Sequence, residues 1–209
     1  MAQSARDIRI SRRSWLWAGL AAPLFPARAA GGLAVTFDGD NLRVSAPQAH
    51  FLSGKALERL KNADTVVFAS QLTLFGDDHV TVLRRPPADR FVVSYDIWEE
   101  KFSVTMPGAA PRSVSLPSAP AVETWCLENV AISASGLAPD RFFWLRFELR
   151  TADQKDLSNV TRDPAISLRS AIDFFSRKPG ADEPHWTLDS GRLRLADLPR
   201  TPGRGTRNG

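Results

Sequence analysis

The clearest strand of this sequence reads Arg141-Phe142-Phe143-Trp144-Leu145-Arg146-Phe147-Glu148-Leu149-Arg150. Successive side chains of a β-strand point to opposite faces of its sheet. One row here is entirely apolar and consists of Phe143, Leu145, Phe147 and Leu149. The other row mixes one aromatic side chain with charges and consists of Trp144, Arg146, Glu148 and Arg150. The sequence therefore predicts a sheet with one face in a core and one mixed face.

Shorter stretches elsewhere repeat the alternation or are rich in β-branched and aromatic residues. The pair Asp38-Gly39 indicates a hairpin turn, Glu99-Glu100 a second turn, and Ser190-Gly191 a third between two short strands. The Pro-, Ser- and Ala-rich stretch 107–120 is typical of a loop. The predicted strands cover 33–37, 42–44, 65–75, 91–97, 102–106, 141–150, 186–188 and 193–195.

Three short helices are expected beside these strands. Ser53 is the predicted cap of a helix over 54–63, and apolar spacing predicts a second helix over 122–129. A third helix opens at Asp163 and Pro164 and carries an apolar stripe up to Phe175. The fold class is α+β: an antiparallel sheet or sandwich with two or three short flanking helices. One β-rich domain spans 31–198, and a basic tail, 199–209, is expected to be disordered.

Residues 1–30 have the features of a cleaved signal peptide. Ser11-Arg12-Arg13-Ser14-Trp15-Leu16 resembles the twin-arginine export consensus, with Arg12 and Arg13 as the recognised pair. A short apolar run follows, and Ala27-Arg28-Ala29 places cleavage near 29/30. That run is too short to cross a bilayer. The general export route and a buried N-terminal helix are the alternatives. We expect a periplasmic or secreted protein that is not integral to the membrane after processing.

The charge balance argues against a nucleic-acid-binding protein. The chain has 27 Lys and Arg against 23 Asp and Glu. Five of the arginines and one aspartate lie in residues 1–30, which leaves 22 basic and 22 acidic residues after cleavage. A folded nucleic-acid binder needs an excess of basic side chains on its surface. We therefore expect no nucleic-acid partner.

The order of features between residues 37 and 106 resembles a known family. Phe37-Asp38-Gly39-Asp40-Asn41-Leu42-Arg43-Val44 ends a strand, and Phe91-Val92-Val93-Ser94-Tyr95-Asp96 precedes Lys101-Phe102-Ser103-Val104. This is similar to the bacterial exported family named domain of unknown function 4390 (DUF4390). Many members carry paired tryptophans after the long strand, whereas this chain has Gly76-Asp77-Asp78-His79. The resemblance implies an envelope location and a β-rich fold, and it implies no catalytic residues.

Few residues are typical of a catalytic or metal site. Asp77, Asp78 and His79 are the densest polar cluster, which suits either a solvated turn or a metal site completed by another histidine. No nucleophile elbow or phosphate loop is present in the sequence. The single cysteine, Cys126, lies between Trp125 and Leu127 and is expected to be buried and inert. We predict no cofactor and no metal ligand.

Tryptophans beside charged residues are the candidate binding residues. Trp144 shares its face with Arg146, and Trp98 precedes the turn at Glu99-Glu100. A half-exposed aromatic ring among charges can stack on a sugar, a peptide or a protein, unless a helix covers that face. The leading hypothesis is a non-catalytic envelope protein that binds another protein or a ligand through its sheet surface. A hydrolase or metal-dependent enzyme and a carbohydrate-binding module are the alternatives.

Overall fold

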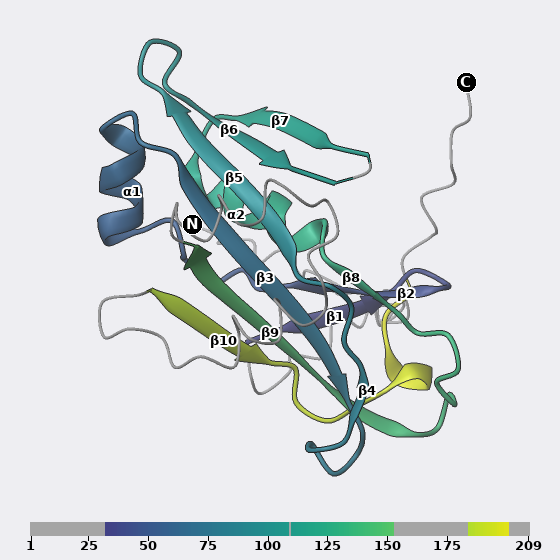
Figure 1. The fold of residues 1–209 in the computed structure, drawn as a ribbon. Coiled ribbons are helices and arrows are strands. Elements are labelled where there is room, and N and C mark those ends of the chain that lie inside the picture. The colour runs from purple at the N-terminus through teal and green to yellow at the C-terminus, as the bar shows by residue number, and fades with distance from the viewer. Residues whose placement is uncertain (1–31, 109, 153–183, 201–209) are drawn as a thin grey trace, which may run out of the picture.

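The computed structural model describes residues 32–108, 110–152 and 184–200, which form two antiparallel sheets and two α-helices (Figure 1). The α+β class predicted from the sequence is confirmed. The strands are β1 Ala34–Phe37, β2 Asn41–Ser45, β3 Val66–Phe75, β4 Val82–Arg84, β5 Asp89–Asp96, β6 Lys101–Met106, β7 Arg112–Leu116, β8 Ala131–Ser133, β9 Phe142–Ala152, β10 His185–Asp189 and β11 Leu193–Arg194. The helices are α1 Gly54–Lys61, α2 Ala119–Glu128 and the short 3₁₀ helix Leu195–Asp197.

The large sheet is built around β3, which pairs with β9 on one side and β5 on the other. Its main path runs in the order β10-β9-β3-β5-β6-β7, with β4 beside β3 and β11 beside β9. The register of β3 with β9 runs from Val67 opposite Ala152 to Phe75 opposite Trp144. The strand that dominates the sequence pattern is therefore joined to a strand about seventy residues earlier in the chain.

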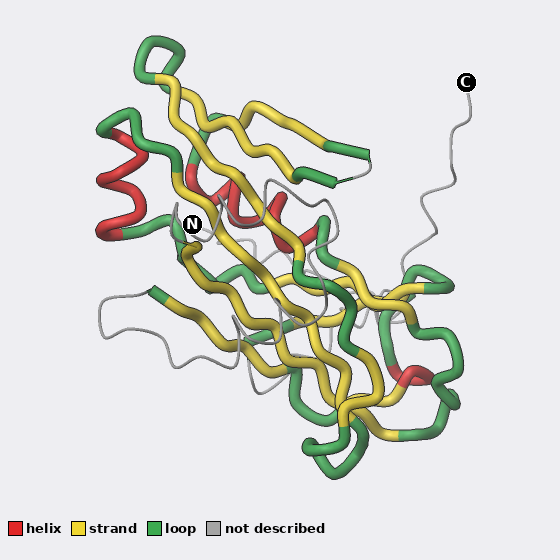
Figure 2. The backbone as a smooth tube through the Cα atoms, viewed as in Figure 1, coloured by secondary structure: helices red, strands yellow, loops and turns green. Residues whose placement is uncertain are grey.

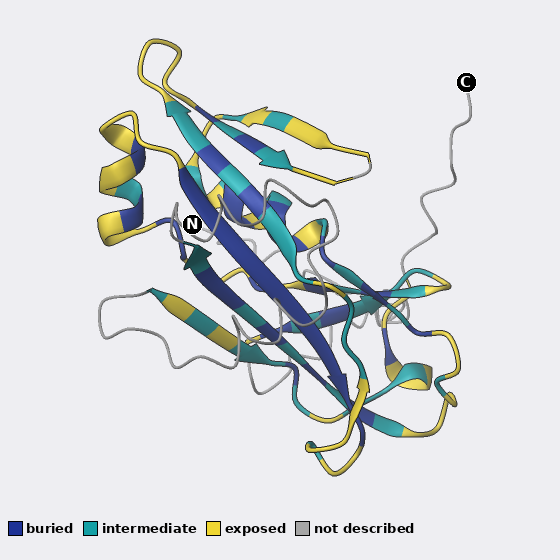
Figure 3. Ribbon diagram, in the orientation of Figure 1, coloured by how far each residue is buried: buried dark blue, intermediate teal, exposed yellow. Residues whose placement is uncertain are grey.

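The small sheet, β1-β2-β8, and helix α2 contribute with the inner face of the large sheet to one core. The expected apolar row of β9 is buried in it, with Leu145 fully excluded from solvent. Strand β3 is buried along its whole length, as Figure 3 shows in dark blue. Its outward-facing residues Gln71 and Thr73 hydrogen-bond to the connection that leads to β5, through Pro86 and Arg85. Both faces of this central strand are therefore covered.

Helix α1 begins at Gly54, as predicted, whereas α2 begins at Ala119, three residues before the predicted start at 122. The Ser118 hydroxyl accepts the backbone N–H of Ala121 at 3.4 Å. Ser53 lies at the N-cap position of α1, as predicted, but its hydroxyl donates to the carbonyl of His50 and makes no capping hydrogen bond to the helix. Cys126 is 2 % exposed within α2, and burial raises the pKa of its thiol. The predicted burial of Cys126 is confirmed.

Two sequence predictions in the middle of the chain are wrong. Residues 107–120 were expected to be a loop, but they contain β7, which pairs with β6 alone at the edge of the large sheet. Serines alternate there with Val114 and Leu116, so the apolar signal is weak. Ile97 was expected in the buried row of β5, but it lies in the following turn and is 54 % exposed.

The C-terminal strands are arranged differently from the expected pair. Strands β10 and β11 do not pair with each other; both pair with β9, one after the other along the same strand. Between them, Ser190 bonds to Leu145 through its backbone N–H and its hydroxyl. Pro199 and Arg200, expected to begin the tail, lie beside Phe37. The expected helix from Asp163 and the signal peptide lie outside the described residues.

None of the helices within the described ranges has the length and apolar composition that a membrane crossing requires.

Candidate functional site

The turn between β5 and β6 is held by the side chain of Asp96. Its Oδ1 accepts the backbone N–H of Trp98 at 2.8 Å and that of Glu99 at 3.0 Å. This Asx-type turn ends β5 one residue before Ile97. Glu100 takes a left-handed backbone conformation, with φ of 53°, and leads the chain into β6. Local hydrogen bonds therefore fix the tip of this hairpin.

The same turn presents two apolar side chains to solvent. Trp98 is 96 % exposed and Ile97 is 54 % exposed. Figure 2 shows the turn as a loop beyond the ends of its two strands, next to α1. Lys101 forms an ion pair with Glu99 at 3.3 Å beside these apolar side chains. Because tryptophan is enriched among the residues that dominate protein interfaces, Trp98 is a candidate contact residue.

Trp144, the second predicted contact residue, has a different environment. It lies on the outer face of β9, where the His79 ring packs against it at a centroid distance of 4.5 Å. Its indole Nε1 is buried and has no hydrogen-bond partner among the described residues. The ring is half-buried, and among the described residues it is packed against His79, which lies in the turn after β3.

Arg146, the third predicted contact residue, is engaged within the molecule. Its guanidinium donates to both carboxylate oxygens of Asp189, at 2.9 and 3.3 Å. This hydrogen bonding raises the pKa of Arg146, and the guanidinium also lies 5.3 Å from the centre of the Phe75 ring. Arg146 and Trp144 therefore belong to one packed cluster that ties β9 to β10 and to the turn after β3.

The structure brings Trp144 and Arg146 together but places Trp98, the remaining predicted contact residue, far from both. Trp144 lies opposite Phe75, the last residue of β3, whereas the Trp98 turn lies beyond Val93, which is paired with Val66 at the start of β3. A strand of ten residues spans about 33 Å. Trp98 and Trp144 are therefore at opposite ends of the large sheet and cannot line one pocket.

The carboxylates of Asp77 and Asp78 are used to build the turn after β3. Both oxygens of Asp77 accept hydrogen bonds from Arg192, at 2.7 and 2.8 Å, which lowers the pKa of Asp77. Hydrogen bonds from the Thr81 hydroxyl and from the backbone N–H groups of Thr81 and Val80 lower the pKa of Asp78 to about 2. Within the described residues, no three His, Cys, Asp or Glu side chains form a group that fits a metal ion.

Sequence reasoning missed a second exposed apolar patch, which we call the β4 patch and define as Val80, Val82 and Leu83. Their exposed fractions are 77 %, 45 % and 40 %. They lie in and beside β4, at the end of β3 opposite to the Trp98 turn. Val80 and Val82 stand two residues apart, as in a strand, but the run is short and ends at Arg84 and Arg85, so the sequence signal is weak.

Comparison with known proteins adds no assignment to these surfaces. No family model, no curated protein and no solved structure matches this chain. The arguments for a function therefore rest on the geometry of the Trp98 turn and of the β4 patch.

Proposed function

We propose that this chain is an exported, non-catalytic envelope protein that binds another protein through the β5–β6 turn of its large sheet. The observation that carries this proposal is the exposure of Trp98, 96 %, on a turn fixed by Asp96. Tryptophan is among the residues that contribute most binding energy in protein interfaces. A turn that is already ordered also loses little conformational entropy on binding.

The Trp98 turn supports a protein partner better than the Trp144 face does. The Trp144 ring is packed against His79, and the guanidinium of Arg146 is bonded to Asp189. A partner would have to displace these internal contacts before it reached either side chain. Trp98 and Ile97 need no such rearrangement, because both are exposed.

A photoreactive phenylalanine analogue in place of Trp98 tests this proposal in cells that export the chain. We expect a discrete light-dependent adduct, because the analogue keeps an aromatic ring at the tip of the turn. The same analogue at Ser115, an exposed residue of the edge strand β7, is the control. Equal cross-linking at both positions would contradict a specific contact at the turn.

Export itself is part of the proposal and rests on Arg12 and Arg13. Lysine lacks the planar guanidinium of arginine, so Arg12→Lys combined with Arg13→Lys should block recognition by a twin-arginine system. We expect uncleaved precursor to accumulate in the cytoplasm, as measured by fractionation and immunoblotting. Normal processing of the double variant would indicate the general export route.

A further inference from the structure

The large apolar side chains that are exposed in the described part of the chain fall into two groups. One group is Ile97 and Trp98 on the β5–β6 turn, and the other is the β4 patch, Val80, Val82 and Leu83. Large apolar groups that gather on a surface commonly mark an interface. Two such groups on one chain are candidates for a direct contact with each other.

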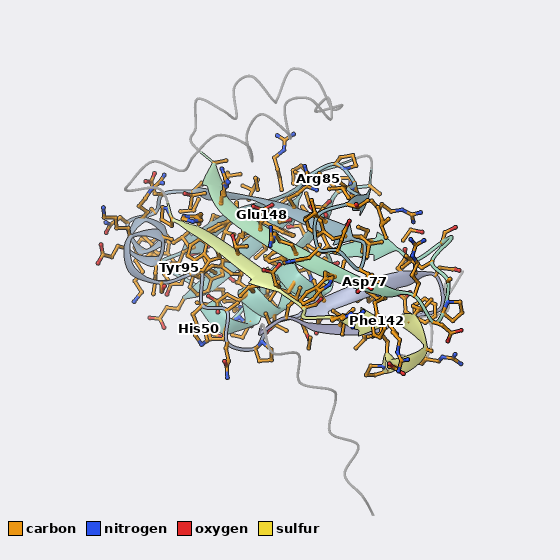
Figure 4. All side chains as sticks on the ribbon, turned by 90° about the horizontal axis from the view of Figure 1, so that it is seen from below. His50, Asp77, Arg85, Tyr95, Phe142 and Glu148 are labelled. Carbon is orange, nitrogen blue, oxygen red and sulfur yellow. The ribbon has the colours of Figure 1, made fainter. Side chains whose placement is uncertain are left out.

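Within one molecule the two groups cannot meet. The β5–β6 turn lies beyond the first residue of β3, whereas the β4 patch lies beside its last residues, Leu74 and Phe75. Figure 3 shows these two exposed ends at the top and the bottom of the sheet. Figure 4 shows the same separation from below, with Tyr95 at one end and Asp77 at the other. Any contact between the groups must therefore join two molecules.

The charges around the two groups are opposite in sign. The β5–β6 turn carries three carboxylates, of Asp96, Glu99 and Glu100, against one ammonium group, of Lys101. The surroundings of the β4 patch carry more guanidinium groups than carboxylates. The guanidinium groups are those of Arg84, Arg85, Arg141, Arg146 and Arg192, and the carboxylates are those of Asp77, Asp78, Asp140 and Asp189. An acidic rim around one apolar group and a basic rim around the other favour their association.

Both surfaces are also ordered before any contact. Asp96 accepts two backbone N–H groups of the β5–β6 turn, and Asp78 accepts those of Val80 and Thr81 at 3.0 and 2.8 Å. Two aspartates therefore fix the backbone on which the exposed apolar side chains stand. Surfaces that are ordered in the free molecule lose little entropy when they associate.

We propose that the partner of the β5–β6 turn is a second copy of this chain, with Trp98 of one molecule packed on the β4 patch of the other. This inference rests on the proposed function and names its partner. A twofold axis allows each molecule to supply one turn and one patch, which closes a dimer. Repetition of a single contact gives an open head-to-tail chain instead. The acidic rim of the turn opposes binding to anionic lipid.

Sedimentation velocity of the full chain, from about 1 to 100 μM, tests the proposal, since weak specific complexes fall in this range of Kd. We expect reversible self-association in the wild-type protein. Trp98→Ala and Val80→Ser should each weaken it at least about tenfold, because each removes a large part of one apolar group. Ser115→Ala, on an exposed residue outside both groups, should leave it unchanged. A wild-type protein that stays monomeric over the whole range would overturn the proposal.

A charge exchange tests the proposed pairing of the two surfaces. Glu99→Lys with Glu100→Lys should abolish self-association, and so should Arg85→Glu with Arg141→Glu. Arg84 is kept, because it donates to the carbonyls of Ser133 and Ser135, whereas within the described part of the chain Arg85→Glu removes a single hydrogen bond, the one to the Thr73 hydroxyl. An equimolar mixture of the two double variants should associate again, because one acidic turn has become basic and one basic patch acidic.

Melting temperatures close to that of the wild type show that the variants are folded. If two folded double variants fail to associate when mixed, the pairing is wrong. A monomeric wild-type protein whose position 98 still cross-links to a different protein rejects the second copy but leaves the proposed function standing. Loss of both the self-association and the cross-link rejects both.

Discussion

Phe147→Ala should lower the free energy of unfolding by about 3–5 kcal/mol, the usual cost of truncating a buried aromatic side chain. Phe147 is 2 % exposed and lies in the centre of β9, between Leu72 of β3 and Leu188 of β10. Truncation of its ring would leave a cavity in the core beneath three adjacent strands of the large sheet. The expected loss is a large share of the roughly 5–15 kcal/mol that keeps a domain folded. Denaturant unfolding measures it directly.

Trp144→Ala is the matched comparison on the opposite face of β9. The Trp144 ring is half-buried, and its aromatic contact is with His79 on a turn. We expect a loss of about 1–2 kcal/mol, from one aromatic contact and part of the buried area. Equal losses in the two variants would show that both faces of β9 contribute equally to stability.

The elements that the sequence predicts well are those whose pattern is local. The apolar row from Phe143 to Leu149 and the alternation in β5 and β6 follow from a two-residue period, and the structure confirms them. The hairpin at Asp38-Gly39 is also local, because its turn residues stand between the strands they join. A single sequence contains all the information that these elements need.

Strand pairing depends on residues that are far apart in the chain, so no local pattern predicts it. The partner of β9 on one side is β3, and on the other side β10 and β11 share the edge. The turn signal at Ser190-Gly191 indicated a hairpin, but Ser190 instead bonds to Leu145. Its backbone N–H and hydroxyl bridge the gap between two short strands that pair with the same partner.

The candidate site was predicted in part. Trp98 was a candidate from the sequence, and the structure shows it exposed on its turn. The two-residue alternation of apolar side chains continues to Ile97 and therefore predicts this residue inside the strand. In the structure β5 ends at Asp96, because the Asp96 carboxylate accepts the backbone N–H groups of Trp98 and Glu99. The cover over Trp144 could not be predicted either, since His79 reaches it only through the pairing of β9 with β3.

The second large effect on stability is expected at Glu123, a carboxylate inside the core. Glu123 lies in α2 and is 4 % exposed, although charged side chains are seldom buried without partners. Its Oε1 accepts the backbone N–H of Leu52 at 2.7 Å, and its Oε2 lies 3.2 Å from Nδ1 of His50. Phe51, between these two residues, packs against Phe68 in the core. Glu123 therefore holds the segment between β2 and α1 against α2.

Glu123→Ala should lower the free energy of unfolding by about 1–3 kcal/mol, because the buried N–H of Leu52 loses its acceptor. Glu123→Gln keeps an oxygen for that N–H, so it should retain most of the stability. Glu128→Ala, at an exposed position of the same helix, is the control and should have little effect. Denaturant unfolding of the three variants separates the contributions.

If Gln proves as costly as Ala, the negative charge of Glu123 is required, and its interaction with His50 contributes more than the hydrogen bond to Leu52. If Ala costs nothing, the segment around Phe51 is held by packing alone.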